Sequence, residues 1–148
     1  MASKVQKSVI VTGGTSGIGL AMTRHFASEG HKVAVLDIND KTGPEVIAKV
    51  ASEYPEAAVS FRRSDVTSWE DQAAAFQEIY REHGRIDIVM ANAGISEQGQ
   101  SSMVKVEEDE PVKPDTRSLD VNLLGAIYCT FSLPIPPHLD LRISNRES

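Results

Sequence analysis

The chain has 148 residues and carries 15 Lys and Arg against 21 Asp and Glu, which gives a net charge of −6 at pH 7. With 41% hydrophobic and 24% charged residues it has the composition of a single globular domain, which excludes disordered and collagen-like proteins. The acidic balance and the 5% aromatic content argue against a nucleic-acid or anionic-membrane surface and favour a small-molecule ligand.

The first apolar run, at residues 9–11, is too short for a signal-peptide core or a membrane span. The single cysteine, Cys129, cannot form an internal disulfide, which is typical of a reducing compartment or of a fold that needs no disulfide. We therefore expect a cytoplasmic protein without a membrane segment. The four histidines share no metal-ligand spacing, so no metal site is expected.

Four apolar runs have the length of strands, at residues 8–12, 32–37, 58–62 and 86–91. Between them, residues 17–28, 44–53 and 69–83 have a helical period, and the last of these helices has Ser68 as N-cap and Gly84 as its stop. Strands and helices thus alternate along the chain. This order predicts an α/β fold, a doubly wound parallel sheet with helices on both faces and right-handed crossovers.

The alternation loosens after residue 91. Residues 95–114 contain an acidic run at 107–110 and two prolines, and they predict an exposed loop. A further helix is expected from near Thr116 through Tyr128, but the prolines between residues 132 and 138 cannot continue it. We therefore divide the chain into a domain at residues 1–130 and an irregular, proline-rich tail at residues 131–148.

A glycine-rich segment, TGGTSGIG at residues 12–19, follows the first predicted strand and opens the first predicted helix. Such a turn forms an anion site, because it exposes backbone N–H groups, the helix dipole favours negative charge, and glycine lets a pyrophosphate approach the main chain. The segment therefore predicts a dinucleotide site. Its expected binding residues are Gly13, Thr15, Ser16, Gly17, Ile18 and Gly19.

Asp37 ends the second predicted strand, where a carboxylate can accept hydrogen bonds from both ribose hydroxyls of an adenosine. Alternatively, Asp37 is a surface loop residue or a helix cap. The carboxylate would repel a 2′-phosphate, and neither Ser16 nor Ile38 supplies a positive charge there. The sequence therefore predicts a site for NAD, with Asp37 and Ile38 in it, in preference to NADP.

Five motifs, in this order, resemble those of the short-chain dehydrogenase/reductase family over about residues 5–130. They are T-G-x-x-x-G-x-G at Thr12, Gly13, Gly17 and Gly19, then Asp37, Asp65-Val66, Asn92-Ala93-Gly94, and the segment DVNLLG at residues 120–125. The resemblance implies a Rossmann-like sheet and an NAD-dependent oxidoreductase that acts on a secondary alcohol or ketone. It also implies that the helix at residues 116–130 takes part in forming homo- or hetero-oligomers.

The resemblance assigns further roles in the site. Asp65 and Val66 would contact the adenine, although Asp65 alternatively caps a turn before Ser68. The side chain of Asn92 would tie neighbouring strands together, and the small residues Ala93 and Gly94 would leave room for the nicotinamide ribose. Asn122 would be the catalytic asparagine, whose position on a distorted helix extends a proton relay in the family; alternatively it is a polar residue satisfied by local hydrogen bonds.

The family's Tyr-x-x-x-Lys pair has no counterpart in this sequence. Tyr54, Tyr80 and Tyr128 are followed four residues later by alanine, glycine and serine, and no lysine follows Lys113. Such a pair moves the hydroxyl proton as hydride is transferred. We therefore expect a chain that is inactive alone, a truncated product with roughly the first half of the fold. The alternative is a non-catalytic NAD-binding remnant or an interaction partner of a full-length relative.

An incomplete sheet of about four strands has a further consequence. In the strand order 3-2-1-4-5-6 the fourth strand lies next to the fifth. Here the predicted strand at residues 86–91 would form an unprotected edge, and such edges pair with other chains. The sequence therefore predicts that the isolated chain is poorly soluble or self-associates.

Overall fold

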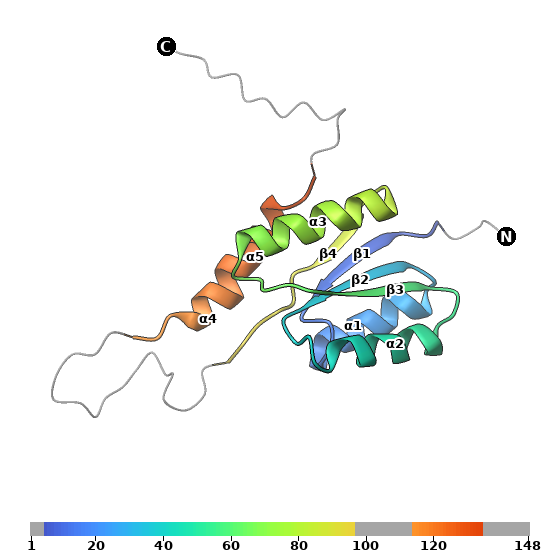
Figure 1. Ribbon diagram of the computed structural model, residues 1–148, viewed down its shortest axis with the longest axis horizontal. Helices are drawn as coiled ribbons and strands as arrows, with labels where there is room; N and C mark the ends of the chain where they lie inside the picture. Colours follow the sequence, from blue (N-terminus) through green and yellow to red (C-terminus); the bar gives the residue numbers. More distant parts are fainter. Residues whose placement is uncertain (1–4, 97–113, 135–148) are drawn as a thin grey trace, which may run out of the picture.

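The computed structural model describes residues 5–96 and 114–134 (Figure 1). Its four strands are β1 (Ser8–Thr12), β2 (Lys32–Asp37), β3 (Ala58–Arg63) and β4 (Ile88–Met90). They form one parallel sheet with the order β3-β2-β1-β4. The predicted α/β class and the incomplete doubly wound sheet are thereby confirmed.

Helices cover both faces of the sheet (Figure 1). One face carries α1 (Gly17–Ser28) and α2 (Gly43–Glu53), and the other carries α3 (Trp69–His83) and the C-terminal helical segment. That segment is continuous and consists of α4 (Arg117–Leu119), the π-helical turn η2 (Asp120–Leu124) and α5 (Gly125–Phe131).

Successive side chains of a strand point to opposite faces of the sheet, so the strands contribute to a hydrophobic cluster on each face. Val9 and Val35 pack with Ile47 on the side of α1 and α2, whereas Ile10 and Phe76 belong to the cluster on the side of α3 and α5. Every residue of β1 is buried. This explains why the strand is almost continuously apolar and why it lies inside the sheet.

Local signals fix the ends of α3 as the sequence predicts. The hydroxyl of Ser68 accepts a hydrogen bond from the backbone N–H of Asp71 at 3.1 Å. Gly84 ends the helix with φ of 80°, a left-handed conformation that glycine adopts without a Cβ clash. Both predicted caps are confirmed.

The fourth strand is shorter than predicted, and side chains add hydrogen bonds to β1 at both of its ends. The carboxylate of Asp87 accepts the backbone N–H of Ser8 at 2.8 Å and pairs with Arg85. Beyond Met90, the backbone N–H of Asn92 donates to the hydroxyl of Thr12 at 3.0 Å. The strand predicted at residues 86–91 is reduced to Ile88–Met90, which pairs only with β1 among the described residues.

The helix expected near Thr116 is present and ends at Phe131, before the first proline of the tail. The acidic run of the predicted loop and residues 135–148 of the predicted tail lie outside the described residues. In the described ranges, no helix is long and apolar enough to cross a membrane.

Candidate functional site

A pocket of about 450 Å³ opens where the carboxyl ends of the four parallel strands meet. We call it the strand-end pocket. In open α/β sheets this edge is the usual place for a ligand. Of the residues predicted from sequence, it is lined by Gly13, Ser16, Gly17, Ile18, Gly19, Asp37, Ile38, Asp65, Val66, Asn92, Ala93 and Gly94.

The glycine loop after β1 owes its shape to residues without side chains. Gly13 and Gly17 have φ of 64° and 50°, in the left-handed region. At Gly19, a Cβ would collide with the carbonyl oxygen of Gly13 and would lie 2.6 Å from Nδ2 of Asn92. The loop therefore packs directly against the chain that follows β4.

The loop ends at the N-terminus of α1, which faces the strand-end pocket. Ser16 occupies the N-cap position with an extended backbone, its hydroxyl makes no cap hydrogen bond, and the residue lines the pocket. The first N–H groups of a helix have no partner within the helix and carry partial positive charge. This end of the pocket therefore suits an anion.

Thr23 fixes the glycine loop from inside α1. Its buried hydroxyl lies 2.9 Å from the carbonyl oxygen of Gly19 and 3.2 Å from that of Gly14. Sequence reasoning missed this residue, because a threonine within a helix gives no signal of a contact with a loop.

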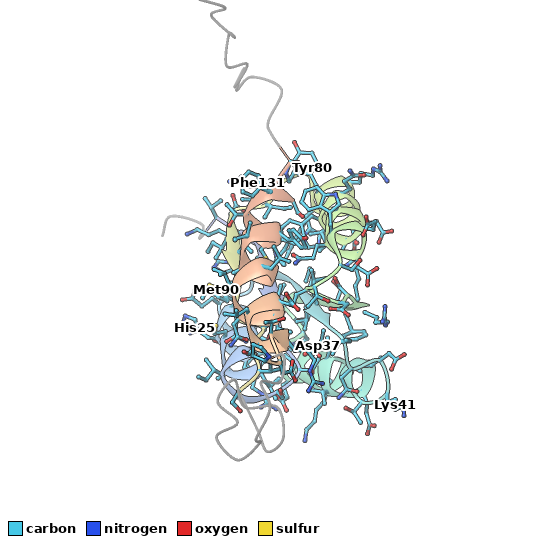
Figure 2. All side chains as sticks on the ribbon, turned by 90° about the vertical axis from the view of Figure 1, so that its left-hand side faces the viewer. His25, Asp37, Lys41, Tyr80, Met90 and Phe131 are labelled. Carbon is cyan, nitrogen blue, oxygen red and sulfur yellow. The ribbon has the colours of Figure 1, made fainter. Side chains whose placement is uncertain are left out.

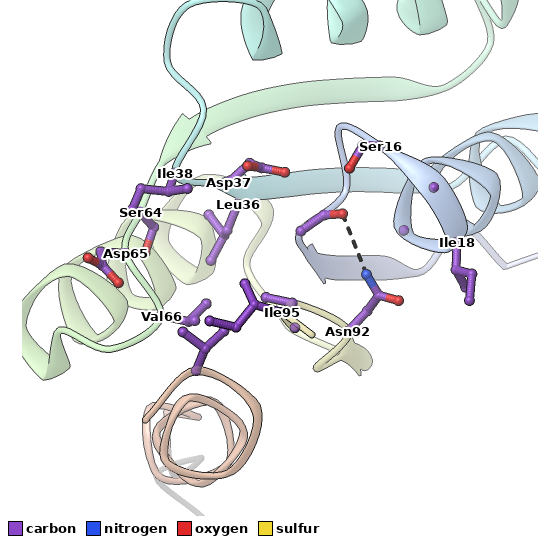
Figure 3. Close-up of a pocket in the computed structure, with 16 residues that line it drawn as sticks. Ser16, Ile18, Leu36, Asp37, Ile38, Ser64, Asp65, Val66, Asn92 and Ile95 are labelled. Carbon is purple, nitrogen blue, oxygen red and sulfur yellow. Dashed lines mark hydrogen bonds between the residues drawn. The ribbon is translucent and has the colours of Figure 1, made fainter. Parts of the chain in front are cut away.

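Asp37, at the end of β2, is held in place by Thr15. One carboxylate oxygen accepts both the hydroxyl of Thr15, at 2.6 Å, and its backbone N–H, at 3.1 Å, while the other accepts the backbone N–H of Asn39 at 3.1 Å. Asp37 lines the strand-end pocket (Figure 3), whereas Thr15 does not. Thr15 thus acts on the pocket through Asp37, which also organises its own loop.

Asp65 and Val66, after β3, form another part of the wall. One carboxylate oxygen of Asp65 accepts the backbone N–H of Thr67 at 2.9 Å and its hydroxyl at 2.7 Å. Asp65 therefore caps a turn and also lines the pocket, so the two sequence-based interpretations are compatible.

Asn92 links the end of β1 to the chain that follows β4, at the floor of the pocket. Its Nδ2 donates to the carbonyl oxygen of Thr12 at 3.1 Å and lies 3.5 Å from that of Gly13, the bond drawn in Figure 3. Together with the hydroxyl of Thr12, which accepts the N–H groups of Asn92 and Ala93, this joins β4 to β1. The glycine loop and the wall opposite are therefore held at a fixed spacing.

Asn122 lies in the π-helical turn and does not line the strand-end pocket. Its Oδ1 accepts the backbone N–H of Ile95 at 2.8 Å, and its Nδ2 donates to the carbonyl oxygen of Ile95 at 2.9 Å. The amide thus satisfies the backbone of a pocket residue, and the helix around it is distorted.

Four lining residues were not among the predicted site residues: Leu36, Ser64, Ile95 and Val121. The first three are direct chain neighbours of predicted residues, so adjacency was the available signal. Val121 also neighbours a predicted residue, Asn122, but it is Val121 that lines the pocket while Asn122 does not, and only the packing of the helix onto the sheet determines which of the two faces it.

The sequence model of a protein family, described as short chain dehydrogenase, matches residues 7–135 of this chain. The chain is 39% identical over 129 residues to the short-chain dehydrogenase/reductase ascJ of Acremonium egyptiacum, covering 86% of this chain and 40% of the relative. It is 35% identical over 138 residues to the 3-oxoacyl-[acyl-carrier-protein] reductase FabG of Chlamydia muridarum, covering 93% and 52%.

Solved structures agree with these matches. An NAD⁺-bound xylitol dehydrogenase has a TM-score of 0.72 at 30% identity, covering 86% of this chain and 46% of that one. The NADPH-dependent 3-quinuclidinone reductase of Rhodotorula rubra has a TM-score of 0.71 at 28% identity, covering 85% and 45%. The chain spans about half the length of these proteins or less. It belongs to the short-chain dehydrogenase family, a family of oxidoreductases that use NAD or NADP.

Proposed function

We propose that the strand-end pocket binds NAD(H) in preference to NADP(H). The observation that carries the proposal is Asp37, whose carboxylate Thr15 orients at the pocket wall, on a strand next to the glycine loop. In this proposal the pyrophosphate lies at the glycine loop and the adenosine ribose at Asp37. Asp65 and Val66 hold the adenine.

The residues present fit such a cofactor. The anion-binding end and the carboxylate lie in one pocket, as a dinucleotide requires, and its volume of about 450 Å³ is that of a small-molecule site. Ile18 and Ile38 are 71% and 58% exposed, so apolar surface is available to a ligand there. When bound, a nicotinamide cofactor supplies hydride transfer.

The preference for NAD rests on charge. A carboxylate at Asp37 repels a 2′-phosphate. Its oxygens accept N–H and O–H groups of the protein, and these hydrogen bonds hold the carboxylate in position at this wall. Relatives include both an NADP-dependent dehydrogenase from Cochliobolus lunatus and the NAD⁺-bound xylitol dehydrogenase. Membership in the family therefore does not decide between NAD and NADP, and we assign this preference to residues such as Asp37.

For the reaction, we propose a secondary alcohol or ketone as the substrate class of the protein, by family. None of the three tyrosines of this sequence is followed four residues later by lysine. We therefore propose that this chain, taken alone, binds cofactor without turnover. Asn122 corresponds to the family's catalytic asparagine, and here it positions the backbone of Ile95 at the pocket.

Residues 1–130 form the proposed cofactor domain, and residues 131–148 form a separate tail. The cytoplasm is the proposed location.

Replacing Asp37 by alanine tests the cofactor proposal. Calorimetric titration of the wild-type chain with NAD⁺ and NADP⁺ should show tighter binding of NAD⁺. In D37A, NAD⁺ should bind about tenfold more weakly, the effect of losing about 1.4 kcal/mol of interaction with the ribose, and NADP⁺ should bind better than in the wild type. Asp40, an exposed acid in the same loop, provides the matched control D40A, which should bind like the wild type. Unchanged affinities in D37A would refute the assignment.

A second candidate function is pairing with a full-length relative through the helix at residues 116–130. Leu119, Leu123, Ile127 and Phe131 are spaced by four residues and are between 41% and 74% exposed. Figure 2 shows Phe131 at one end of this helix, far from Asp37. An exposed apolar stripe of this kind is typical of a protein–protein contact. Co-purification with a full-length relative would support this function, and turnover by the chain alone would count against it.

A further inference from the structure

Gln72 is a fully buried polar residue on α3, on a helix face that is otherwise apolar. Its Nε2 donates to the carbonyl oxygen of Val66 at 2.6 Å and to that of Gly125 at 3.0 Å. Its Oε1 accepts the thiol of Cys129 at 3.0 Å. One amide therefore joins three elements: the loop after β3, the start of α5 and α3 itself.

One of these carbonyl groups belongs to a residue that lines the strand-end pocket, and the other lies next to a segment that lines it. Val66 lines the pocket beside Asp65, and Gly125 directly follows the π-helical turn that carries Val121 and Asn122. In Figure 3, Val66 lies next to the orange helix at the lower side of the pocket. A Cβ on Gly125 would lie 3.0 Å from a methyl group of Val66, so the two segments are in close contact.

We propose that Gln72 is a positioning residue that sets the spacing between the Val66 wall and the π-helical turn, and thereby the width of the strand-end pocket. The inference rests on the proposed cofactor function. The two Nε2 bonds hold both backbones to one rigid group, whereas an apolar side chain of similar size would leave both carbonyl groups without these donors. Buried carbonyl groups that lose a donor move toward other partners or water, because an unsatisfied buried group costs free energy.

Burying the amide of Gln72 costs free energy, which indicates that this side chain does more than fill space. A buried amide loses its hydration, and α3 needs only an apolar side chain to pack against α5. Cys129 and Phe76 already supply apolar contacts in the same cluster. The hydrogen bonds of Gln72 therefore determine geometry rather than packing.

Three variants separate geometry from packing. Q72M keeps the shape and removes both donors. Q72E keeps one donor only when the introduced carboxyl is protonated, which burial favours at low pH. C129V removes the thiol contact and leaves both Nε2 bonds intact. Gln77, exposed on the same helix, gives the control Q77M. For each protein, the dissociation constant for NADH is measured by fluorescence titration at pH 8 and pH 5.5, beside urea unfolding.

If Gln72 sets the width of the pocket, Q72M should bind NADH about tenfold more weakly than the wild type at both pH values. Q72E should be equally weak at pH 8 and should recover at least half of the loss at pH 5.5, relative to the wild type at the same pH. C129V and Q77M should bind within about twofold of the wild type. In a Q72E protein that urea unfolding shows to be folded at both pH values, the pH-dependent recovery of affinity is a signature that a purely structural role would not produce. Q72E remains informative if Q72M fails to fold.

The opposite results overturn the proposal. Wild-type affinity in folded Q72M, equal pH profiles for Q72M and Q72E, or a loss in C129V as large as that in Q72M would each show that the amide does not set the pocket. If the wild-type chain itself does not bind NADH, the proposed function fails first, and the two failures are thereby distinguished.

Discussion

Replacing Gly19 by alanine tests how the glycine loop is packed against the chain after β4. The added methyl group would collide with the carbonyl oxygen of Gly13 and would lie 2.6 Å from Nδ2 of Asn92. Neither neighbour can yield easily, because Gly13 is backbone and Asn92 is bound to the carbonyl oxygen of Thr12 at 3.1 Å. The loop must therefore move away from β4.

The magnitude follows from two contributions. Overpacking in a closely packed region costs about 2 kcal/mol, and loss of the Asn92 hydrogen bond costs about 1 kcal/mol more. A total of about 3 kcal/mol lowers the melting temperature of a domain of this size by about 9 °C. NADH binding should be lost as well, because the displaced loop no longer presents its N–H groups to the pyrophosphate.

The matched control is Gly17→Ala. At Gly17 the backbone φ is 50° and an added Cβ would meet nothing within 4 Å, so only the left-handed conformation costs free energy, about 1 kcal/mol. Thermal and urea unfolding of both variants without ligand, followed by NADH titration, make the comparison. A Gly19→Ala protein as stable as Gly17→Ala would refute the packing argument.

Two further predictions concern titratable groups outside the pocket. Burial lowers the pKa of His83, whose Nδ1 lies 2.8 Å from the hydroxyl of Ser8, and it outweighs the opposing charge of Glu82. Below pH 6.5 the unfolded state therefore binds more protons than the folded state, so this part of the stability is present above pH 6.5 and is lost as the pH falls. Urea unfolding between pH 8 and 5 should show a steeper loss in the wild type than in His83→Gln, and parallel curves would contradict this. Burial also raises the pKa of the Cys129 thiol to about 11, so iodoacetamide at pH 8 should label it only in denaturant; labelling of the native protein at the rate of a free cysteine would contradict the structure.

The sequence was sufficient for the elements whose signals are local. The apolar run at residues 8–12, the glycines after it and the caps Ser68 and Gly84 each act within a few residues, and the structure places β1, the loop and α3 as predicted. The end of β4 was harder to predict. The residue just before this strand, Asp87, binds the backbone of Ser8 on another strand, a contact that the sequence around Asp87 does not show.

The site was predictable where it follows strand ends and unpredictable where it depends on packing. Asp37 and Asp65 could be identified because the carboxyl ends of parallel strands converge. The role of Thr15 became visible only with the 2.6 Å bond to Asp37, since the loop sequence alone does not show which side chains face the ligand. Gln72 gave no signal, because its partner Gly125 comes from a distant part of the chain.

Hydrogen–deuterium exchange of the wild-type chain with and without NADH tests the central claim most directly, because it reports both binding and its location. The account predicts that NADH slows exchange of backbone amides at residues 13–19, 36–38, 64–66 and 92–95, which surround the strand-end pocket. Exchange on the exposed face of α2 should be unchanged. Absence of protection, or protection that omits the glycine loop and Asp37, would contradict the assignment of this pocket as a cofactor site.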